Sequence, residues 1–598
     1  MSERLDEAAD AWPQRPWIMA AICAVAGVAF HFLIDHPFPE PLEPWRQAAA
    51  TCVAIATLSF VMTVERFRWQ WAVGFAVAWG LVIALVGWFT AQYNVQATIF
   101  EWPYLSGIFA VMIAAPLFQT IRDEGRASLP YERLHGHAWA DAVIGASSLF
   151  FTGVVFLLAW LIAGLFGLIG IEEVRKLLEK GWFAWALAGF AFGASAGLLR
   201  ERDRLLPMLQ RLLRIVLSVL APPLAVALVL FLASIPFTGL EKFWKSGVPA
   251  TPPLLLAGAG AILMANTVFA ESRESRSPSA VLRWAALLLV AVVLPLAAIA
   301  ALSIGIRIDQ YGWTPGRIWG VIAVAVAIAY GLAGWFSIWR GRLDFDERLR
   351  PLQTALAVGL CGLALLLALP ILDFGAISAN SQMARLQSGK VSPTKFDWRA
   401  MAFDFGPSGR ATLERVKRGG DPEQRMMAAT ALAAKDRWAL SEERIVAGPP
   451  PADLTVFPRG APVPQELRAM LLGGPGVKQA FCAGGGACRV FVQPAARTFI
   501  VFLDGCANLP AARRDDPKVQ CRRDPAVFEQ RNGKWTNVYL TSVRDIAANM
   551  SDGAMPRSEE AARLKQESQA LDRGDVKIAP VTMRQLVVGG RPAGDPFR

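Results

Sequence analysis

The chain has 598 residues, 54% of them apolar, and a formal net charge of +11. That apolar content is too high for an ordinary soluble protein, so the composition excludes a typical soluble enzyme. A helix needs about 20 mostly apolar residues to cross a bilayer, and the first 373 residues are dominated by such stretches.

We predict a polytopic α-helical membrane protein with about 11 transmembrane helices. The eleven candidate stretches are 17–35, 47–64, 70–91, 103–119, 142–170, 182–199, 212–235, 252–270, 281–304, 317–339 and 352–372. The stretch 142–170 is too short for two spans, which favours one tilted helix. Stretches 47–64, 103–119 and 252–270 are short or rich in Ala, Gly and Thr, and losing one would reverse the side of everything after it.

Basic residues near the ends of spans predict the orientation. With the N-terminus in the cytoplasm, the cytoplasmic segments hold 19 Lys and Arg and the opposite loops hold 8. We therefore predict a cytoplasmic N-terminus and a C-terminal part outside the cytoplasm.

The first external loop contains three acids, Asp35, Glu40 and Glu43. Membrane glycosyltransferases that use polyprenyl-linked donors resemble this plan of many spans, an acidic first loop and an external C-terminal domain. A carboxylate here would act as a base or metal ligand. The competing interpretation is an ordinary solvated loop.

Polar residues within the spans are few. Asn266 lies inside a stretch, Asp141 at the edge of one, and no stretch has a central acid or base, which disfavours an ion-coupled pump. Pro222-Pro223, Pro295 and Pro370 interrupt apolar runs and favour either packed kinks or broken helices around a cavity. His135 and His137 are expected on the surface, because no further metal ligands are evident.

The most distinctive local sequence is a turn between two stretches, comprising Arg307, Asp309, Tyr311, Gly312, Thr314, Pro315 and Arg317. Gly312 permits a turn, Thr314 is a candidate N-cap and Pro315 suits a first helical position. The residues favour a capped re-entry turn, and Arg307, Asp309 and Arg317 are candidates for a small ion cluster.

The Tyr-Gly-x-Thr-Pro-x-Arg pattern at 311–317 resembles the signature of an uncharacterised bacterial membrane-protein family, domain of unknown function 4153. The segment 376–382, with Ser392-Pro393 and Phe396-Asp397, is similar to members of the same family. The resemblance implies a polytopic bacterial inner-membrane protein and brings no activity or catalytic residues with it.

We divide the chain into a transmembrane domain (1–373), which contains all eleven stretches, a helical junction (374–448) and an extracytoplasmic α+β domain (449–598). Asp421-Pro422 is typical of a helix start. The runs 488–492 and 498–503 predict short strands, and Asn532-Gly533 predicts a hairpin turn.

Four of the seven cysteines lie in this tail: Cys482, Cys488, Cys506 and Cys521. An even, clustered set favours disulfides, which persist in an oxidising compartment. The alternative is zinc, but the spacings are not those of close ligand pairs and the tail has no His. Three connectivities are open, and the sequential one closes the shortest loops.

The positive charge belongs to the tail, which has 33 basic and 23 acidic residues. A basic external surface favours anionic lipid or an envelope polymer as partner, beside the bilayer itself, and its location disfavours nucleic acid. Nucleotide-binding, zinc-protease and serine-hydrolase motifs are missing, so we expect no cofactor and no metal. We predict an envelope interaction or assembly component; the alternatives are a transporter with a kinked-helix cavity and the polyprenyl-linked glycosyltransferase.

Overall fold

The chain forms two compact units, Met1–Gln382 and Met383–Arg598. The structure is a computed structural model, and it describes residues 12–592 except for 37–41, 93–97, 202–204, 240–248, 435–436, 438–439, 441–452, 474–479, 485, 493–497, 505–522, 532, 539–564, 567–568, 577–586 and 589–590. The predicted domain limits at 373 and 448 stay predictions.

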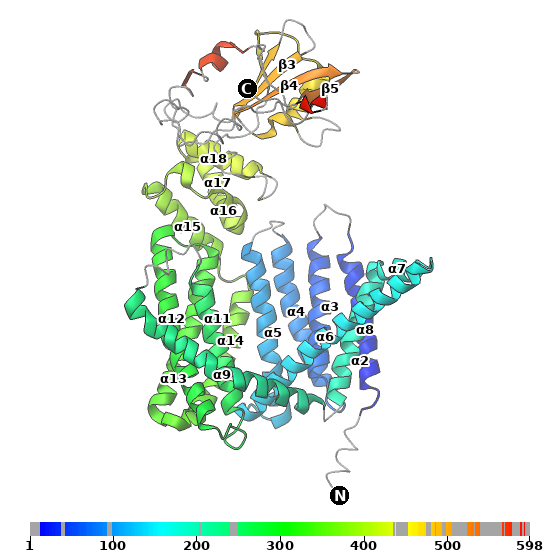
Figure 1. The fold of residues 1–598 in the computed structure, drawn as a ribbon, viewed down its shortest axis with the longest axis vertical. Coiled ribbons are helices and arrows are strands. Elements are labelled where there is room, and N and C mark those ends of the chain that lie inside the picture. The colour runs from blue at the N-terminus through cyan, green and yellow to red at the C-terminus, as the bar shows by residue number, and fades with distance from the viewer. Residues whose placement is uncertain are drawn as a thin grey trace. The chain divides into compact units, whose positions relative to one another are not determined.

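The first unit is a bundle of long helices (Figure 1). Its elements are α2 (Arg15–Ile34), α3 (Pro44–Thr63), α4 (Trp69–Gln92), α5 (Thr98–Glu124), α6 (Tyr131–Leu168), α7 (Glu173–Leu178), α8 (Gly181–Glu201), α9 (Leu205–Thr238), α11 (Thr251–Phe269), α12 (Ala280–Tyr311), α13 (Pro315–Gly341), the 3₁₀ turn η1 (Arg342–Asp344), α14 (Phe345–Ala368) and α15 (Phe374–Gln387). Helix α2 packs on α8, α3 on α4, and α11, α12 and α13 pack in sequence, while α5 packs against α14.

Within the described residues, ten helical segments are long and apolar enough to cross a membrane. The last of them, Pro315–Ala368, consists of α13 and α14 joined by η1. Each of the eleven predicted stretches overlaps one long helix, so the predicted helical membrane class is confirmed.

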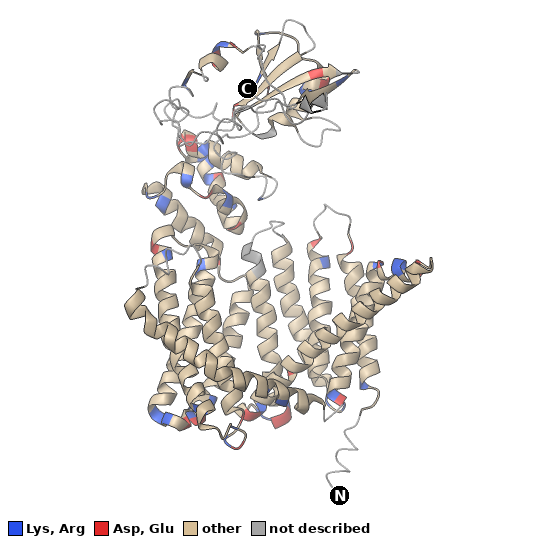
Figure 2. Cartoon of the chain, viewed as in Figure 1, with Lys and Arg blue, Asp and Glu red and all other residues tan. Residues whose placement is uncertain are grey.

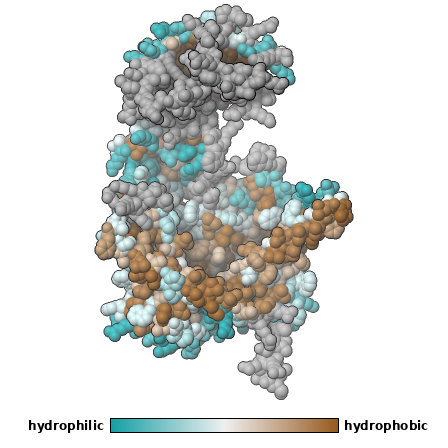
Figure 3. All heavy atoms as spheres, viewed as in Figure 1, coloured by the Kyte–Doolittle hydropathy of each residue, from teal (hydrophilic) through white to brown (hydrophobic). Residues whose placement is uncertain are grey.

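The outward faces of these helices are apolar. Leu149, Phe150 and Leu157 on α6 are each at least 66% exposed. Figure 2 shows charged residues gathered at the helix ends, and Figure 3 shows an apolar belt between them. Exposure of so large an apolar surface to water is unfavourable, whereas the lipid chains of a bilayer would cover it.

Helix α6 is a single helix of 38 residues, as expected for one long span. At about 1.5 Å per residue it is roughly 57 Å long, well beyond a bilayer core of about 30 Å. It runs obliquely across α3 and α4 in Figure 1. The helix begins at Tyr131, eleven residues before the predicted stretch, and this earlier start changes the surroundings of His135.

Glycines allow α2 and α8 to pack with their backbones in close approach. A Cβ added to Gly189 would lie 2.1 Å from the Cys23 carbonyl oxygen, and one added to Gly193 would lie 2.3 Å from that of Met19. A Cβ at Gly27, on the facing helix, meets a backbone oxygen at 2.2 Å. Small residues at such positions are the usual basis of tight helix pairs in membranes.

Three arginines cap the carboxyl end of α3. Arg15, Arg122 and Arg200, from α2, α5 and α8, donate to the carbonyl oxygens of residues 62–64. Arg200 also pairs with Asp141 on α6 at 2.9 Å. The last carbonyls of a helix lack intrahelical partners and carry partial negative charge, so guanidinium groups stabilise this end and tie four helices together.

The second unit contains short helices and a sheet. Its helices include α16 (Trp398–Phe403), α17 (Gly406–Gly419), α18 (Pro422–Ala433) and α20 (Gln465–Leu472), with 3₁₀ turns η2 (Pro393–Lys395) and η3 (Phe481–Gly484). Helix α18 begins at the predicted Asp421-Pro422 pair, where the Asp421 carboxylate accepts from the amides of Glu423 and Gln424.

The five-stranded sheet has the order β1 (Thr455–Phe457), β2 (Ala487–Val492), β3 (Thr498–Asp504), β4 (Arg523–Arg531) and β5 (Lys534–Val538). Strand β1 is parallel to β2 and the other pairs are antiparallel. The predicted strands and the β4–β5 hairpin are confirmed. A separate two-stranded ribbon joins β6 (Val587–Val588) and β7 (Arg591–Pro592).

Both faces of this sheet are covered, because successive side chains along β2 point to opposite faces and pack there against other elements. Val490 packs with Leu467 and Leu471 of α20, and Phe491 packs on the opposite face with Leu571. A disulfide joins Cys482 to Cys488 beside the first of these clusters. Cys506 and Cys521 lie outside the described residues.

Candidate functional site

The helical unit contains a cavity of about 970 Å³ between α5, the start of α6, α11, α12, α13 and α14. That is near the upper end of the roughly 300–1,000 Å³ typical of small-molecule sites. Along α13 its wall runs from Gly316 to Tyr330, and along α14 from Gln353 to Leu367. Fourteen residues of helix rise about 21 Å, so the cavity extends through much of a bilayer core.

Small residues leave this space open. Gly258 on α11 and Gly316 on α13 have nothing within 4 Å of an added Cβ, and Ala323, Ala327 and Ala357 add little volume to the wall. Larger side chains at these positions would fill the gap between the helices, as they do in an ordinary close-packed core.

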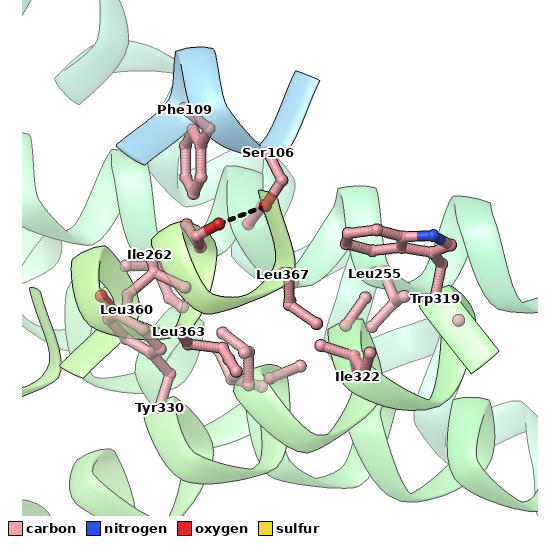
Figure 4. A pocket seen from close by; sticks show the side chains of 18 of the residues that line it. Ser106, Phe109, Leu255, Ile262, Trp319, Ile322, Tyr330, Leu360, Leu363 and Leu367 are labelled. Atoms are coloured by element: carbon pink, nitrogen blue, oxygen red, sulfur yellow. Dashed lines mark hydrogen bonds between the residues drawn. The ribbon is translucent and has the colours of Figure 1, made fainter. Parts of the chain in front are cut away.

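The middle of the cavity is apolar. Figure 4 shows aliphatic side chains around it: Leu255, Ile262, Ile322, Leu360, Leu363 and Leu367. The Ser106 hydroxyl nearby donates to the Ala364 carbonyl oxygen at 2.9 Å and is thereby satisfied. An apolar cavity of this kind favours an apolar ligand over an ion or a sugar.

One end of the cavity, here named the histidine end, is closed by hydrogen bonds between α6, α14 and α11. The Tyr131 hydroxyl lies 3.0 Å from His135 Nδ1 and donates to Gln353 Oε1 at 2.9 Å. Gln353 Nε2 donates in turn to Asn266 Oδ1 at 3.0 Å. Because each of these groups has a partner, the network holds three helices together at a point where apolar packing is interrupted.

A buried ion pair lies close to Gln353 on α14. Arg350 Nη2 bonds Asp346 Oδ2 at 2.7 Å and donates to the Phe269 and Ser272 carbonyl oxygens at 2.8 and 3.0 Å. Arg276 approaches the same carboxylate at 3.4 Å. These contacts fasten the α11–α12 loop to the start of α14, a structural role.

The opposite end, named the arginine end, is lined by Arg307, Arg317 and Trp319, where α12 gives way to α13. Gly312 ends α12 with φ +74° and ψ −178°, a conformation that requires glycine. Pro315 is the first residue of α13, as predicted. Thr314 occupies the N-cap position but its side chain makes no capping hydrogen bond, so the expected hydroxyl cap is wrong.

Other contacts stabilise this turn. Arg317 Nη1 donates to the carbonyl oxygens of Tyr311, at 3.1 Å, and Gly312. From α15, Gln382 Nε2 donates to the carbonyls of Tyr311 and Trp313 at 2.9 and 3.0 Å, and Ser381 Oγ accepts from the Trp313 amide at 3.1 Å. The two segments on which the family resemblance depends, 311–317 and 376–382, are therefore in direct contact.

Comparison with known families gives one match. The family model described as Domain of unknown function (DUF4153) matches residues 49–415. The chain belongs to this family. The matched region contains every residue that lines the cavity, together with the turn and α15. No curated protein and no solved structure matches the chain.

The acidic loop of this DUF4153 member is away from the cavity wall. Asp35 is exposed, and Glu43 Oε2 accepts from Trp45 Nε1 at 2.6 Å. Arg46 donates to the carbonyls of Leu33 and Asp35 at 2.9 and 2.6 Å, which ties the end of α2 to the start of α3. Glu40 lies outside the described residues. Neither Asp35 nor Glu43 lines the cavity.

In this DUF4153 member His135 lies inside the helical unit and not on its surface. His135 is only 8% exposed and bonds Tyr131, so the expectation of a surface residue is wrong for it; His137 is half-buried, with Nε2 3.0 Å from an Asp123 carboxylate oxygen. The spacing of Tyr131 and His135, four residues apart, would have signalled a contact once a helix was expected there. In the described part of the chain no group of three metal-ligating side chains occurs.

Of the proposed ion cluster, Arg307 and Arg317 line the cavity and Asp309 is exposed. Among the intramembrane polar residues noted from sequence, Asn266 joins the histidine end and Asp141 pairs with Arg200. The cavity itself could not be read from sequence, since it depends on how six helices pack.

Proposed function

We propose that this DUF4153 protein is an inner-membrane component of the cell envelope that binds a lipid-like molecule in the cavity of its helical unit. The observation that supports this proposal is the cavity. It is long, apolar in its middle and formed by helices inside the region that the family model matches. This develops the expected transporter with a kinked-helix cavity: α12 has Pro295 within it, near Val293 on the wall.

The proposed orientation has the N-terminus in the cytoplasm and the tail in the periplasm. The excess of basic residues in alternate loops supports this, and so does the Cys482–Cys488 disulfide, because disulfides persist in oxidising compartments. In this orientation the histidine end faces the cytoplasm and the arginine end the periplasm. We also propose that the basic tail binds anionic lipid or an envelope polymer. This second proposal is based only on the net positive charge of the tail.

The envelope assembly role predicted from sequence is compatible with lipid binding, and no separate observation favours it. The polyprenyl-linked glycosyltransferase depends on an acid beside the bound chain. Asp35 and Glu43 do not line the cavity, so lipid binding is the better-supported function.

Filling the cavity tests the proposal. Ala357 lines it from α14, whereas Ala355 on the same helix is exposed. We expect the purified full chain to bind a pyrene-labelled long-chain alcohol saturably, Ala357→Trp to abolish binding and Ala355→Trp to leave it unchanged. Equal binding by both variants would contradict a ligand site here.

A further inference from the structure

The arginine end presents hydrogen-bond donors to the cavity. Arg307, Arg317 and Trp319 line it, and no Asp or Glu is among the described residues on the cavity wall. The histidine end, by contrast, pairs its donors and acceptors with each other. The two ends therefore differ in chemistry, and only the arginine end is suited to an anion.

Arg307 is the least constrained of these groups. Its side chain is half-buried on α12 and has no hydrogen bond or ion pair with any residue that the structure describes. Asp309 follows two residues later, and side chains spaced by two on a helix do not face each other. Arg317 already donates to the carbonyls of the turn, which fixes its position beside the cavity.

Trp319 provides an independent observation. Its indole Nε1 is buried and has no acceptor among the described residues. The ring is held by stacking on Trp102, with centroids 5.7 Å apart, and by an edge contact with Phe374 at 5.6 Å. Figure 4 shows Trp319 toward the opposite end of the cavity from Tyr330. A buried donor left without a partner is costly, and a ligand oxygen would satisfy it.

We propose that the bound molecule is an anionic lipid drawn from the membrane, whose long chain occupies the apolar cavity and whose phosphate is held at the arginine end by Arg307, Arg317 and Trp319. This inference rests on the proposed function and names its ligand class. Guanidinium groups suit phosphate because their planar N–H donors match its oxygens and hydrate weakly. The apolar surroundings strengthen the attraction.

Two probes that differ only in headgroup test the inference. Hexadecanol and hexadecyl phosphate would compete with the pyrene-labelled alcohol for the full chain in neutral detergent. We expect hexadecyl phosphate to compete at about tenfold lower concentration, since a charge-assisted hydrogen bond is typically worth that factor or more. Arg307→Gln should remove most of this preference and Arg307→Lys should keep part of it.

Trp319→Phe keeps an aromatic ring at this position and removes the N–H, so we expect it to weaken hexadecyl phosphate binding by about threefold and hexadecanol binding by less, since a neutral hydroxyl is the weaker acceptor. The matched control for Arg307→Gln is Lys176→Gln on α7, an exposed lysine that lies 3.6 Å from Glu172, which should change neither affinity. Retained hexadecanol binding also shows that each variant is folded.

The outcomes separate the two proposals. Equal competition by both probes in the unmodified chain, or a preference that survives Arg307→Gln, overturns the phosphate site and leaves the lipid cavity standing. Failure of both probes to compete overturns the cavity proposal and this inference with it.

Discussion

Replacing Gly193 by alanine should separate α2 from α8. The added methyl carbon would lie 2.3 Å from the Met19 carbonyl oxygen, about 1 Å short of ordinary van der Waals contact. This steric clash cannot be relieved by a rotamer change, because both atoms are fixed to helix backbones. The helices must shift apart, and the close contacts at Gly189 and Gly27 must shift with them.

The change in the free energy of unfolding follows from two opposing effects. Overpacking of this kind costs about 1–3 kcal/mol, while alanine in place of glycine within a helix gains about 0.5–1 kcal/mol. Gly153 on α6 provides the matched control, since an added Cβ there meets nothing within 4 Å and only the gain applies. We therefore expect Gly193→Ala to be less stable than Gly153→Ala by about 1–3 kcal/mol.

Titration of the full chain in mixed micelles with a denaturing detergent, followed by tryptophan fluorescence, measures this difference. Because α2 and α8 contribute nothing to the cavity wall, the folded Gly193→Ala protein should still bind the pyrene-labelled alcohol. Indistinguishable unfolding midpoints for Gly193→Ala and Gly153→Ala would refute the close packing of the two backbones.

In the tail, Asp504→Ala should lower the free energy of unfolding by about 1.5–3 kcal/mol, because it removes one of the two carboxylates that bond the buried Arg489 at 2.7 Å and leaves only Asp572, which is half-exposed. Asp453→Ala, which breaks an exposed ion pair, should cost no more than about 1 kcal/mol; similar thermal shifts for the two variants would contradict this. At the histidine end, Tyr131→Phe removes the donor to Gln353 and should cost about 1–3 kcal/mol. The same detergent titration measures it, and an unchanged midpoint would argue against the network.

The helical class was predictable because a bilayer forces backbone groups to pair within each segment. Apolar stretches such as 212–235 therefore map directly onto helices such as α9. The turn was predictable for a local reason too, because glycine permits the positive φ that ends α12 at Gly312 and proline fixes φ at Pro315, the first residue of α13. In the tail, Gly533 and the alternating runs around it predicted the β4–β5 hairpin.

Tertiary features were not predictable in this way. His135 was expected on the surface, whereas α6 begins at Tyr131, whose hydroxyl contacts both His135 and Gln353. The cavity depends on small residues from different helices, such as Gly258 and Ala357, facing one another across a gap. Composition reports that such residues are present but not which of them meet.

The central claim, that the helical unit holds a lipid between α11, α13 and α14, is tested most directly by an experimental density map of the full chain in lipid nanodiscs. We expect elongated density along the wall from Tyr330 to Trp319, ending in a compact feature beside Arg307. A cavity filled by rearranged side chains, or one that contains only separate water-sized features, would contradict it.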